Sequence, residues 1–257
     1  MPRSTTTVIS PRPSRPMLLG APVILGLVTL AAWQGLSAAV GSRALPAPTD
    51  LVPRVGRELA EGGLLDYAAV TFSQALLGCL IGFCVAVPLG YLIARSAVAS
   101  AALGPYLAAT QAVPAVALAP LLVLWIGYGL IPIALLCALL VFFPILVNTA
   151  LGLTTLDRDV VDAARVDGAD RLRLLWHIEA PLALPSLLAG VRNGFVLSVT
   201  GAVVGEFVMG GHGLGMLLTY YRDRQDTAGL FVALLALVVL AVAMFFLIRT
   251  LERRLRW

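Results

Sequence analysis

The chain has 257 residues, of which 60% are hydrophobic and 12% are charged. Soluble domains carry about 25% charged residues, so this composition indicates an all-α integral membrane protein with several spans. The formal net charge is +4 and every basic residue is Arg. Because the phosphate-binding loop of nucleotide hydrolases needs a lysine, the chain is expected to carry no standard ATP-hydrolysing site. We also expect that the chain itself binds no cofactor.

The first segment, residues 1–16, is polar, rich in proline and holds three Arg, which predicts a disordered tail. Residues 17–40 form an apolar run that is longer than the roughly 7–15 residues of a signal-peptide core. We therefore expect an uncleaved first span. Residues 41–67 are predicted to be the longest outer loop, with a short amphipathic helix over 51–65.

Three further apolar runs predict spans two, three and four. The second span, 68–94, would be about 40 Å long at the helical rise per residue. The third, 103–126, contains three prolines, which membrane helices tolerate where neighbours or a cavity satisfy the freed carbonyls. We expect it to pack centrally. The fourth covers 131–153.

The most charged segment of the chain, residues 157–185, follows the fourth span. Its apolar residues recur with the spacing of a one-sided helix, and Gly168 stands where such a helix needs a left-handed residue. The pattern predicts a helix over 157–166, a turn, and a second helix over 169–178 that ends at two prolines. An ordinary amphipathic loop fits the pattern equally well.

The predicted spans five and six cover 185–207 and 229–248, so the membrane domain would extend over 17–250 and a basic tail over 251–257. With both termini in the cytoplasm, twelve Arg lie inside and five outside, with Arg192 inside a span. Cytoplasmic segments carry the excess of basic residues. We therefore expect six spans, with both termini and the helical elbow between spans four and five on the cytoplasmic side.

The elbow closely resembles the EAA loop of bacterial ABC importer permeases. The matching residues are Asp162, Ala163, Ala164, Gly168, Ile178 and Pro181. Glu is usual where Asp162 stands, and Asp keeps the charge while shortening the side chain by one methylene. The stretch 45–96 is similar to the nitrate/sulfonate/taurine branch of the same family, in which Arg is usual in place of Gln74.

This resemblance implies that the loop 154–184 docks into a groove on an ATPase subunit. The residues expected to make that contact are Asp162, Ala163, Ala164, Gly168, Ala169, Leu172 and Trp176. The resemblance also implies that two copies of the permease chain form a homodimer. ATP and Mg²⁺ would be held by a cytoplasmic ATP-binding subunit, and an extracytoplasmic solute-binding protein would be a further partner. The expected location is the bacterial cytoplasmic membrane, and nucleic acid is not an expected partner.

Polar and amphipathic side chains within spans three to five are candidates for the transport pathway or its gate. They are Gln111, Trp125, Asn148, Arg192, Asn193, Ser198 and Glu206. Singly, such groups more often form hydrogen bonds between helices than contacts with a ligand. Arg192 lies roughly 10 Å into its span, so it either snorkels to the surface or faces a polar pathway. Glu206 fits a structural or gate-lining role better than chemistry.

The sequence thus predicts the permease subunit of an ATP-driven, binding-protein-dependent importer, and not an enzyme. The expected substrate is a small organic or inorganic anion of the sulfonate, taurine or nitrate type. The alternative substrate is a heterocyclic vitamin precursor of the pyrimidine or thiamine type. A secondary transporter or channel is the alternative of another class, but its mid-membrane carboxylates or repeated halves are not seen in the sequence.

Overall fold

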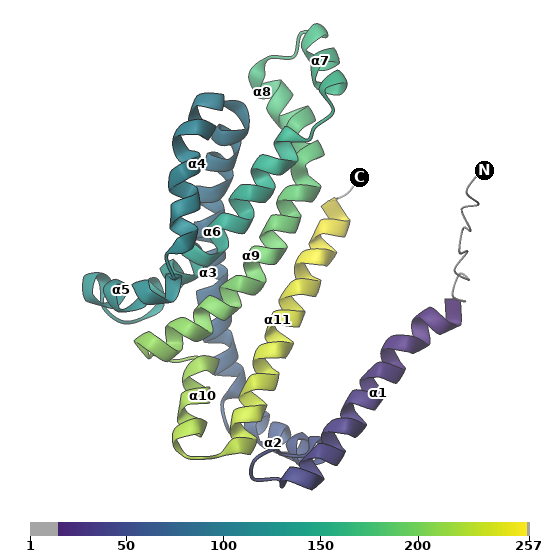
Figure 1. Cartoon of the computed structure of the whole chain (residues 1–257), viewed down its shortest axis with the longest axis vertical. Coiled ribbons are helices and arrows are strands. Elements are labelled where there is room, and N and C mark those ends of the chain that lie inside the picture. The colour runs from purple at the N-terminus through teal and green to yellow at the C-terminus, as the bar shows by residue number, and fades with distance from the viewer. Residues whose placement is uncertain (1–14, 256–257) are drawn as a thin grey trace, which may run out of the picture.

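The computed structural model describes residues 15–255, and all regular structure in this range is helical (Figure 1). Nearly all of the predicted tail 1–16 lies outside the described residues. The elements are α1 (Arg15–Val40), α2 (Pro48–Ala60), α3 (Leu64–Arg95), α4 (Ala97–Ala112), η1 (Ala115–Leu118), α5 (Ala119–Ile126), α6 (Leu130–Thr154), α7 (Arg158–Val166), α8 (Arg171–Leu174), η2 (Leu175–Glu179), α9 (Ala180–Met209), α10 (Leu214–Asp223) and α11 (Thr227–Leu255).

The described residues contain five helices that are long and apolar enough to cross a membrane. They are α1, α3, α6, the continuous helix of α8, η2 and α9, and α11. A sixth span results if the bent pair of α4 and η1–α5 is taken as one. The predicted class, an all-α membrane protein with about six spans, is confirmed.

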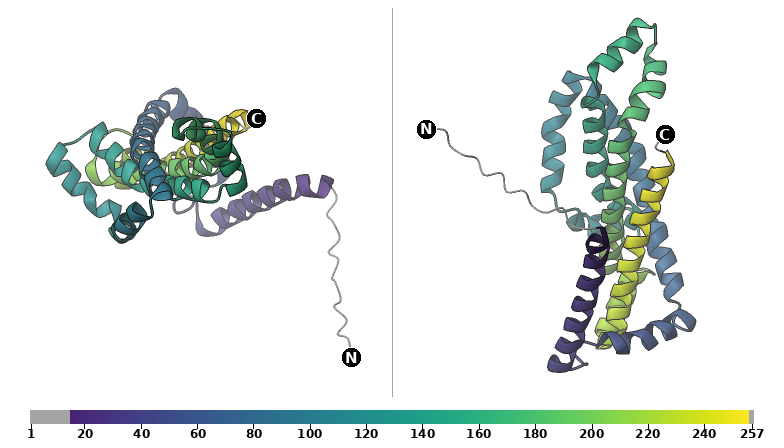
Figure 2. Two further views of the ribbon diagram at one scale, coloured as in Figure 1. Left: turned by 90° about the horizontal axis from the view of Figure 1, so that it is seen from above. Right: turned by 90° about the vertical axis from the view of Figure 1, so that its right-hand side faces the viewer.

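The core of the bundle is built by α3, α6 and α9, which pack on one another (Figures 1 and 2). Glycines let the helices approach closely: a Cβ at Gly78 would lie 2.3 Å from the Cβ of Cys137 on α6. A Cβ at Gly190 of α9 would lie 2.6 Å from the Cβ of Asn148, also on α6. Small residues at such contacts are typical of helix packing in membranes, where dispersion rather than the hydrophobic effect holds helices together.

The third predicted span, 103–126, is not one continuous helix. The axes of α4 and of the following η1–α5 unit differ by 83°. The break falls at Val113, whose extended backbone (φ −82°, ψ 118°) is the conformation favoured before a proline. Pro114 has no N–H with which to continue the helix. The segment is therefore a broken span or a re-entrant loop.

The second elbow helix does not end at residue 178 as predicted. Helical structure continues from Arg171 to Met209 through η2, a π-helical turn in which the N–H of Ala180 bonds to the carbonyl of Leu175. Pro181 lies in the first turn of α9. Because a π turn already shifts the hydrogen-bond register, the missing N–H of this proline is accommodated without ending the helix.

Helix α1 stands apart from the bundle and is joined to it near its C-terminal end (Figures 1 and 2). There the indole N–H of Trp33 donates to the carbonyl of Pro46 (3.1 Å), and the Ser37 hydroxyl donates to the carbonyl of Leu45 (2.6 Å). The amphipathic helix α2 follows. It ends earlier than predicted because the chain turns at Gly63, where φ is +67°, before α3 begins.

Candidate functional site

The elbow projects from one end of the bundle as two short helices, α7 and the α8–η2 unit (Figure 1). Both helices begin with an aspartate that accepts a backbone N–H. The carboxylate of Asp157 accepts from the N–H of Asp159 (3.0 Å), and that of Asp170 accepts from the N–H of Arg173 (2.7 Å). Such caps satisfy donors that a helix start leaves free. The segment is therefore a defined pair of helices.

The turn between these helices depends on Gly168. Its φ is +84°, in the left-handed region, as the sequence predicted. The N–H of Ala169 bonds to the carbonyl of Ala164 (3.0 Å), and the N–H of Gly168 bonds to that of Arg165 (3.1 Å). This is the pair of hydrogen bonds of a Schellman motif. It fixes the direction in which the second helix leaves the first.

The elbow exposes large apolar side chains. Val166 is 87% exposed, and Leu172 and Trp176 are each 68% exposed, whereas Val161 and Leu174 are buried. Exposed apolar side chains that lie together often belong to surfaces that bind partners, so these residues are candidates for such a contact. Five of the predicted docking residues are exposed and two are half-buried. The exposed ones are Asp162, Ala163, Gly168, Leu172 and Trp176, and the half-buried ones are Ala164 and Ala169.

Asp162 has a partner within its own helix. Its carboxylate lies 2.8 Å from the guanidinium of Arg165, one helical turn later, and both side chains are more than half exposed. An exposed pair at this spacing contributes only about 0.3–0.5 kcal/mol. The carboxylate therefore stays accessible to a stronger partner.

An ion pair that the sequence analysis missed joins the elbow to the bundle. Glu179, the last residue of η2, is buried and pairs with Arg95, the last residue of α3. The available signal was an isolated acid at the edge of an apolar stretch. Next to this pair lies an apolar groove of about 500 Å³, with Pro88 and Tyr91 of α3 on one side and Trp176 on the other.

The seven predicted pathway residues do not share one surface of the single chain. Three of them are exposed (Gln111, Trp125 and Asn193), two are half-buried (Asn148 and Arg192), and two are buried (Ser198 and Glu206). The Ser198 hydroxyl donates to the carbonyl of Ala75 (2.6 Å) and so joins α9 to α3. The Arg192 guanidinium lies 5.3 Å from the ring centroid of Phe245 on α11.

Glu206 connects three helices at the end of the bundle opposite the elbow. Its carboxylate accepts from the Thr71 hydroxyl (2.8 Å) on α3 and from the N–H of Gly215 (2.5 Å) on α10. The Thr71 oxygen in turn accepts from the N–H of Leu214 (2.8 Å). A carboxylate at a helix N-terminus is favourable because it meets free N–H groups and the positive end of the dipole. This arrangement holds α10 onto α3 and α9.

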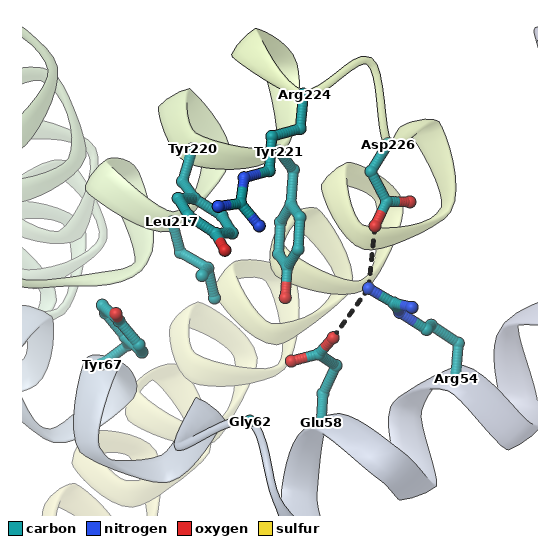
Figure 3. Close-up of a pocket in the computed structure, with 9 residues that line it drawn as sticks. All are labelled: Arg54, Glu58, Gly62, Tyr67, Leu217, Tyr220, Tyr221, Arg224 and Asp226. Carbon is teal, nitrogen blue, oxygen red and sulfur yellow. Dashed lines mark hydrogen bonds and ion pairs between the residues drawn. The ribbon is translucent and has the colours of Figure 1, made fainter.

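A second polar cluster lies at the same end, around a pocket of about 280 Å³ between α2, α3, α10 and the start of α11 (Figure 3). Arg54 of α2 pairs with Glu58 (3.0 Å) and with Asp226 (2.8 Å), which also accepts from the N–H of Gly229 (2.9 Å). Burial raises the pKa of Tyr221 to about 12, so its hydroxyl stays protonated beside this cluster. The cluster fastens α2 to the first turn of α11.

Within residues 15–255, no three His, Cys, Asp or Glu side chains lie close enough to hold a metal ion. The cysteines Cys79, Cys84 and Cys137 are all free thiols.

Residues 86–257 match the family described as the binding-protein-dependent transport system inner membrane component. The chain belongs to this family: it is the transmembrane permease subunit of an ABC importer. It is a multi-pass inner-membrane protein, and ATP is hydrolysed by a separate subunit. The resemblance seen in the sequence is confirmed, and the secondary-transporter alternative is set aside. Members of this family work with an ATP-binding subunit and a solute-binding protein.

The chain is 43% identical to the riboflavin transport system permease protein RibX of Chloroflexus aurantiacus, over 93% of this chain and 90% of the relative. It is 31% identical to the formylaminopyrimidine transport permease protein ThiX of Halalkalibacterium halodurans (90% and 92%). Identity to the putative aliphatic sulfonates transport permease protein SsuC of Bacillus subtilis is 28% (91% and 86%).

The fold is similar to that of a chain in the inward-facing MetNI methionine ABC transporter. The TM-score is 0.68 at 18% sequence identity, with 77% of this chain and 98% of that chain covered. At this level of identity the similarity concerns the fold alone.

Proposed function

We propose that the elbow docks on the ATP-binding subunit, with its end of the bundle and both termini in the cytoplasm. The exposed apolar side chains of Val166, Leu172 and Trp176 support this proposal because they form an accessible surface on a capped, rigid helix pair. The distribution of Arg supports the orientation. Two copies of the chain would enclose the pathway, and closure of the ATPase dimer would move the two elbows together.

We propose further that the cargo is a flavin-type heterocycle, with riboflavin as the first compound to test. The observation that carries this proposal is the 43% identity to RibX over 93% of the chain. The relatives named for formylaminopyrimidine and aliphatic sulfonates are 31% and 28% identical. This proposal replaces the small anion favoured by the sequence analysis and is closer to its heterocyclic alternative.

The substrate is tested by reconstituting the permease with its ATPase and its solute-binding protein in proteoliposomes. We expect ATP-dependent accumulation of riboflavin, followed by its fluorescence, and no competition from excess taurine or formylaminopyrimidine. Liposomes that omit the binding protein serve as the control. Uptake of taurine or formylaminopyrimidine without uptake of riboflavin would contradict the proposed substrate and leave the importer assignment intact.

The docking role of the elbow is tested by the substitution Gly168→Val. At φ +84° a β-branched residue is strained by roughly 1–2 kcal/mol, so the second elbow helix is expected to leave the turn in another direction. We expect ATPase co-purification and uptake to fall about tenfold or more, because roughly 1.4 kcal/mol corresponds to a factor of ten.

The matched control for this substitution is Gly104→Ala on α4, where no atom lies within 4 Å of the new Cβ. This variant is expected to behave like the wild type. Normal ATPase association in the Gly168→Val variant would contradict the docking role of the elbow.

A further inference from the structure

The ion pair between Arg95 and Glu179 lies outside the predicted docking residues, and its carboxylate is buried. Burying a carboxylate is unfavourable unless a charged partner compensates for the lost hydration. Arg95 provides that compensation from a different helix, while its own side chain remains 31% exposed. The pair therefore fixes the position of η2 relative to the end of α3.

The stretch that connects the elbow to α9, η2 and the first turns of α9, is an irregular helix and is expected to bend when the elbow moves. In η2 the N–H of Ala180 bonds five residues back to Leu175, so the regular four-residue spacing of the helical hydrogen bonds is interrupted there. Pro181 and Pro185 then remove two backbone donors from the next turns. A displacement of the elbow is absorbed most easily in this stretch.

The apolar groove leaves the elbow without close packing against α3 at this level. The groove has a volume of about 500 Å³, and its lining includes Pro88 and Tyr91 of α3 and Trp176 of η2. Arg95 lies one helical turn beyond Tyr91 on α3 and pairs with Glu179 at the end of η2. The ion pair is thus a direct connection between the elbow and the helix core.

We propose that the Arg95–Glu179 pair transmits movement of the elbow to α3, and that both are positioning residues for energy coupling. Because α3 packs on α6 and α9, pulling α3 along with α9 moves the core as one unit. Without the pair, movement of α7 and α8 that has passed through η2 would reach α9 only, through the turns that contain Pro181 and Pro185. This inference rests on the proposed docking of the elbow.

The first test uses the complete importer in proteoliposomes, with the variants Glu179→Gln, Arg95→Gln and the exchange Arg95→Glu/Glu179→Arg. The ratio of riboflavin transported to ATP hydrolysed is measured. We expect the ATPase subunit to remain bound to each single variant. The ratio is expected to fall about fivefold or more, which lies within the usual range for coupling between two sites. The exchange is expected to restore at least half of the ratio.

The matched control is Asp223→Asn, which removes a carboxylate from an exposed ion pair with Arg222 on α10 and is expected to leave the ratio unchanged. Three results would overturn the inference: an unchanged ratio in the single variants, loss of ATPase binding in them, or an exchange that restores nothing. If the wild-type chain itself binds no ATPase, the proposed docking fails instead.

A second test follows the movement without transport. Spin labels at Ser96, next to Arg95, and at Arg171 on the elbow report the distance between α3 and the elbow in the complex, in a background without the native cysteines. We expect this distance to stay constant when a non-hydrolysable ATP analogue binds, and to change in the Glu179→Gln variant. The same nucleotide response in both proteins would overturn the inference.

Discussion

Replacing Gly78 by valine is expected to separate α3 from α6 and to leave little folded protein in the membrane. A Cβ at this position would lie 2.3 Å from the Cβ of Cys137 and 2.7 Å from the carbonyl oxygen of Ala134. The second atom belongs to the backbone and cannot rotate away. Overpacking of a core usually destabilises by about 1–3 kcal/mol and occasionally by more. We expect the upper end of that range or beyond, because the two helices pack along most of their length.

The measurement is the yield of monodisperse protein in detergent, together with its thermal unfolding temperature. Gly35→Val is the matched control, because Gly35 also lies in a membrane helix but has no atom within 4 Å of the added Cβ. The control is expected to resemble the wild type. An unchanged unfolding temperature for Gly78→Val would show that α3 and α6 do not pack as described.

Replacing Glu206 by leucine is expected to destabilise the protein by roughly 2–5 kcal/mol. The change leaves the N–H of Gly215 without its acceptor, and it leaves the Thr71 hydroxyl only the carbonyl of Tyr67 (3.2 Å) to donate to. Each buried polar group that loses its partner costs about 1–3 kcal/mol. Glu206→Gln is expected to have an intermediate effect, because its amide oxygen still accepts one of the two hydrogen bonds.

Unfolding by heat or denaturant in detergent micelles measures this effect, with Glu61→Gln at an exposed position as the control. A double-mutant cycle with Thr71→Val isolates the interaction. The two substitutions are expected to be less damaging together than the sum of their separate effects, because they remove two halves of one contact. Strict additivity would indicate that the two side chains do not interact.

The apolar runs predicted most of the fold correctly, since length and hydrophobicity are strong signals for membrane helices. They could not show that the third run is broken at Val113, because a straight and a bent helix of the same residues have the same hydropathy. The run's prolines indicated only an irregularity. The continuation of the elbow through Pro181 was missed for a related reason: the π turn that accommodates it leaves no mark in the sequence.

The elbow was predictable because its determinants are local: caps, charges and one glycine at the turn. The partners of the polar residues within the spans were not predictable, because they depend on which face of each helix meets its neighbours. Ser198 turned out to join α9 to α3, and Glu206 to hold α10. The glycine run after α9 makes room for that carboxylate. A Cβ at Gly213 would lie 1.9 Å from a Glu206 oxygen.

The attachment of α1 has a consequence for how its sequence can change. Most of its surface is exposed in the described chain, and its contacts with the rest are concentrated around Trp33 and Ser37. Over most of its length, selection therefore acts on hydrophobicity and helical propensity, so many apolar residues are interchangeable. Only near the junction with α2 does selection also act on shape and hydrogen bonding.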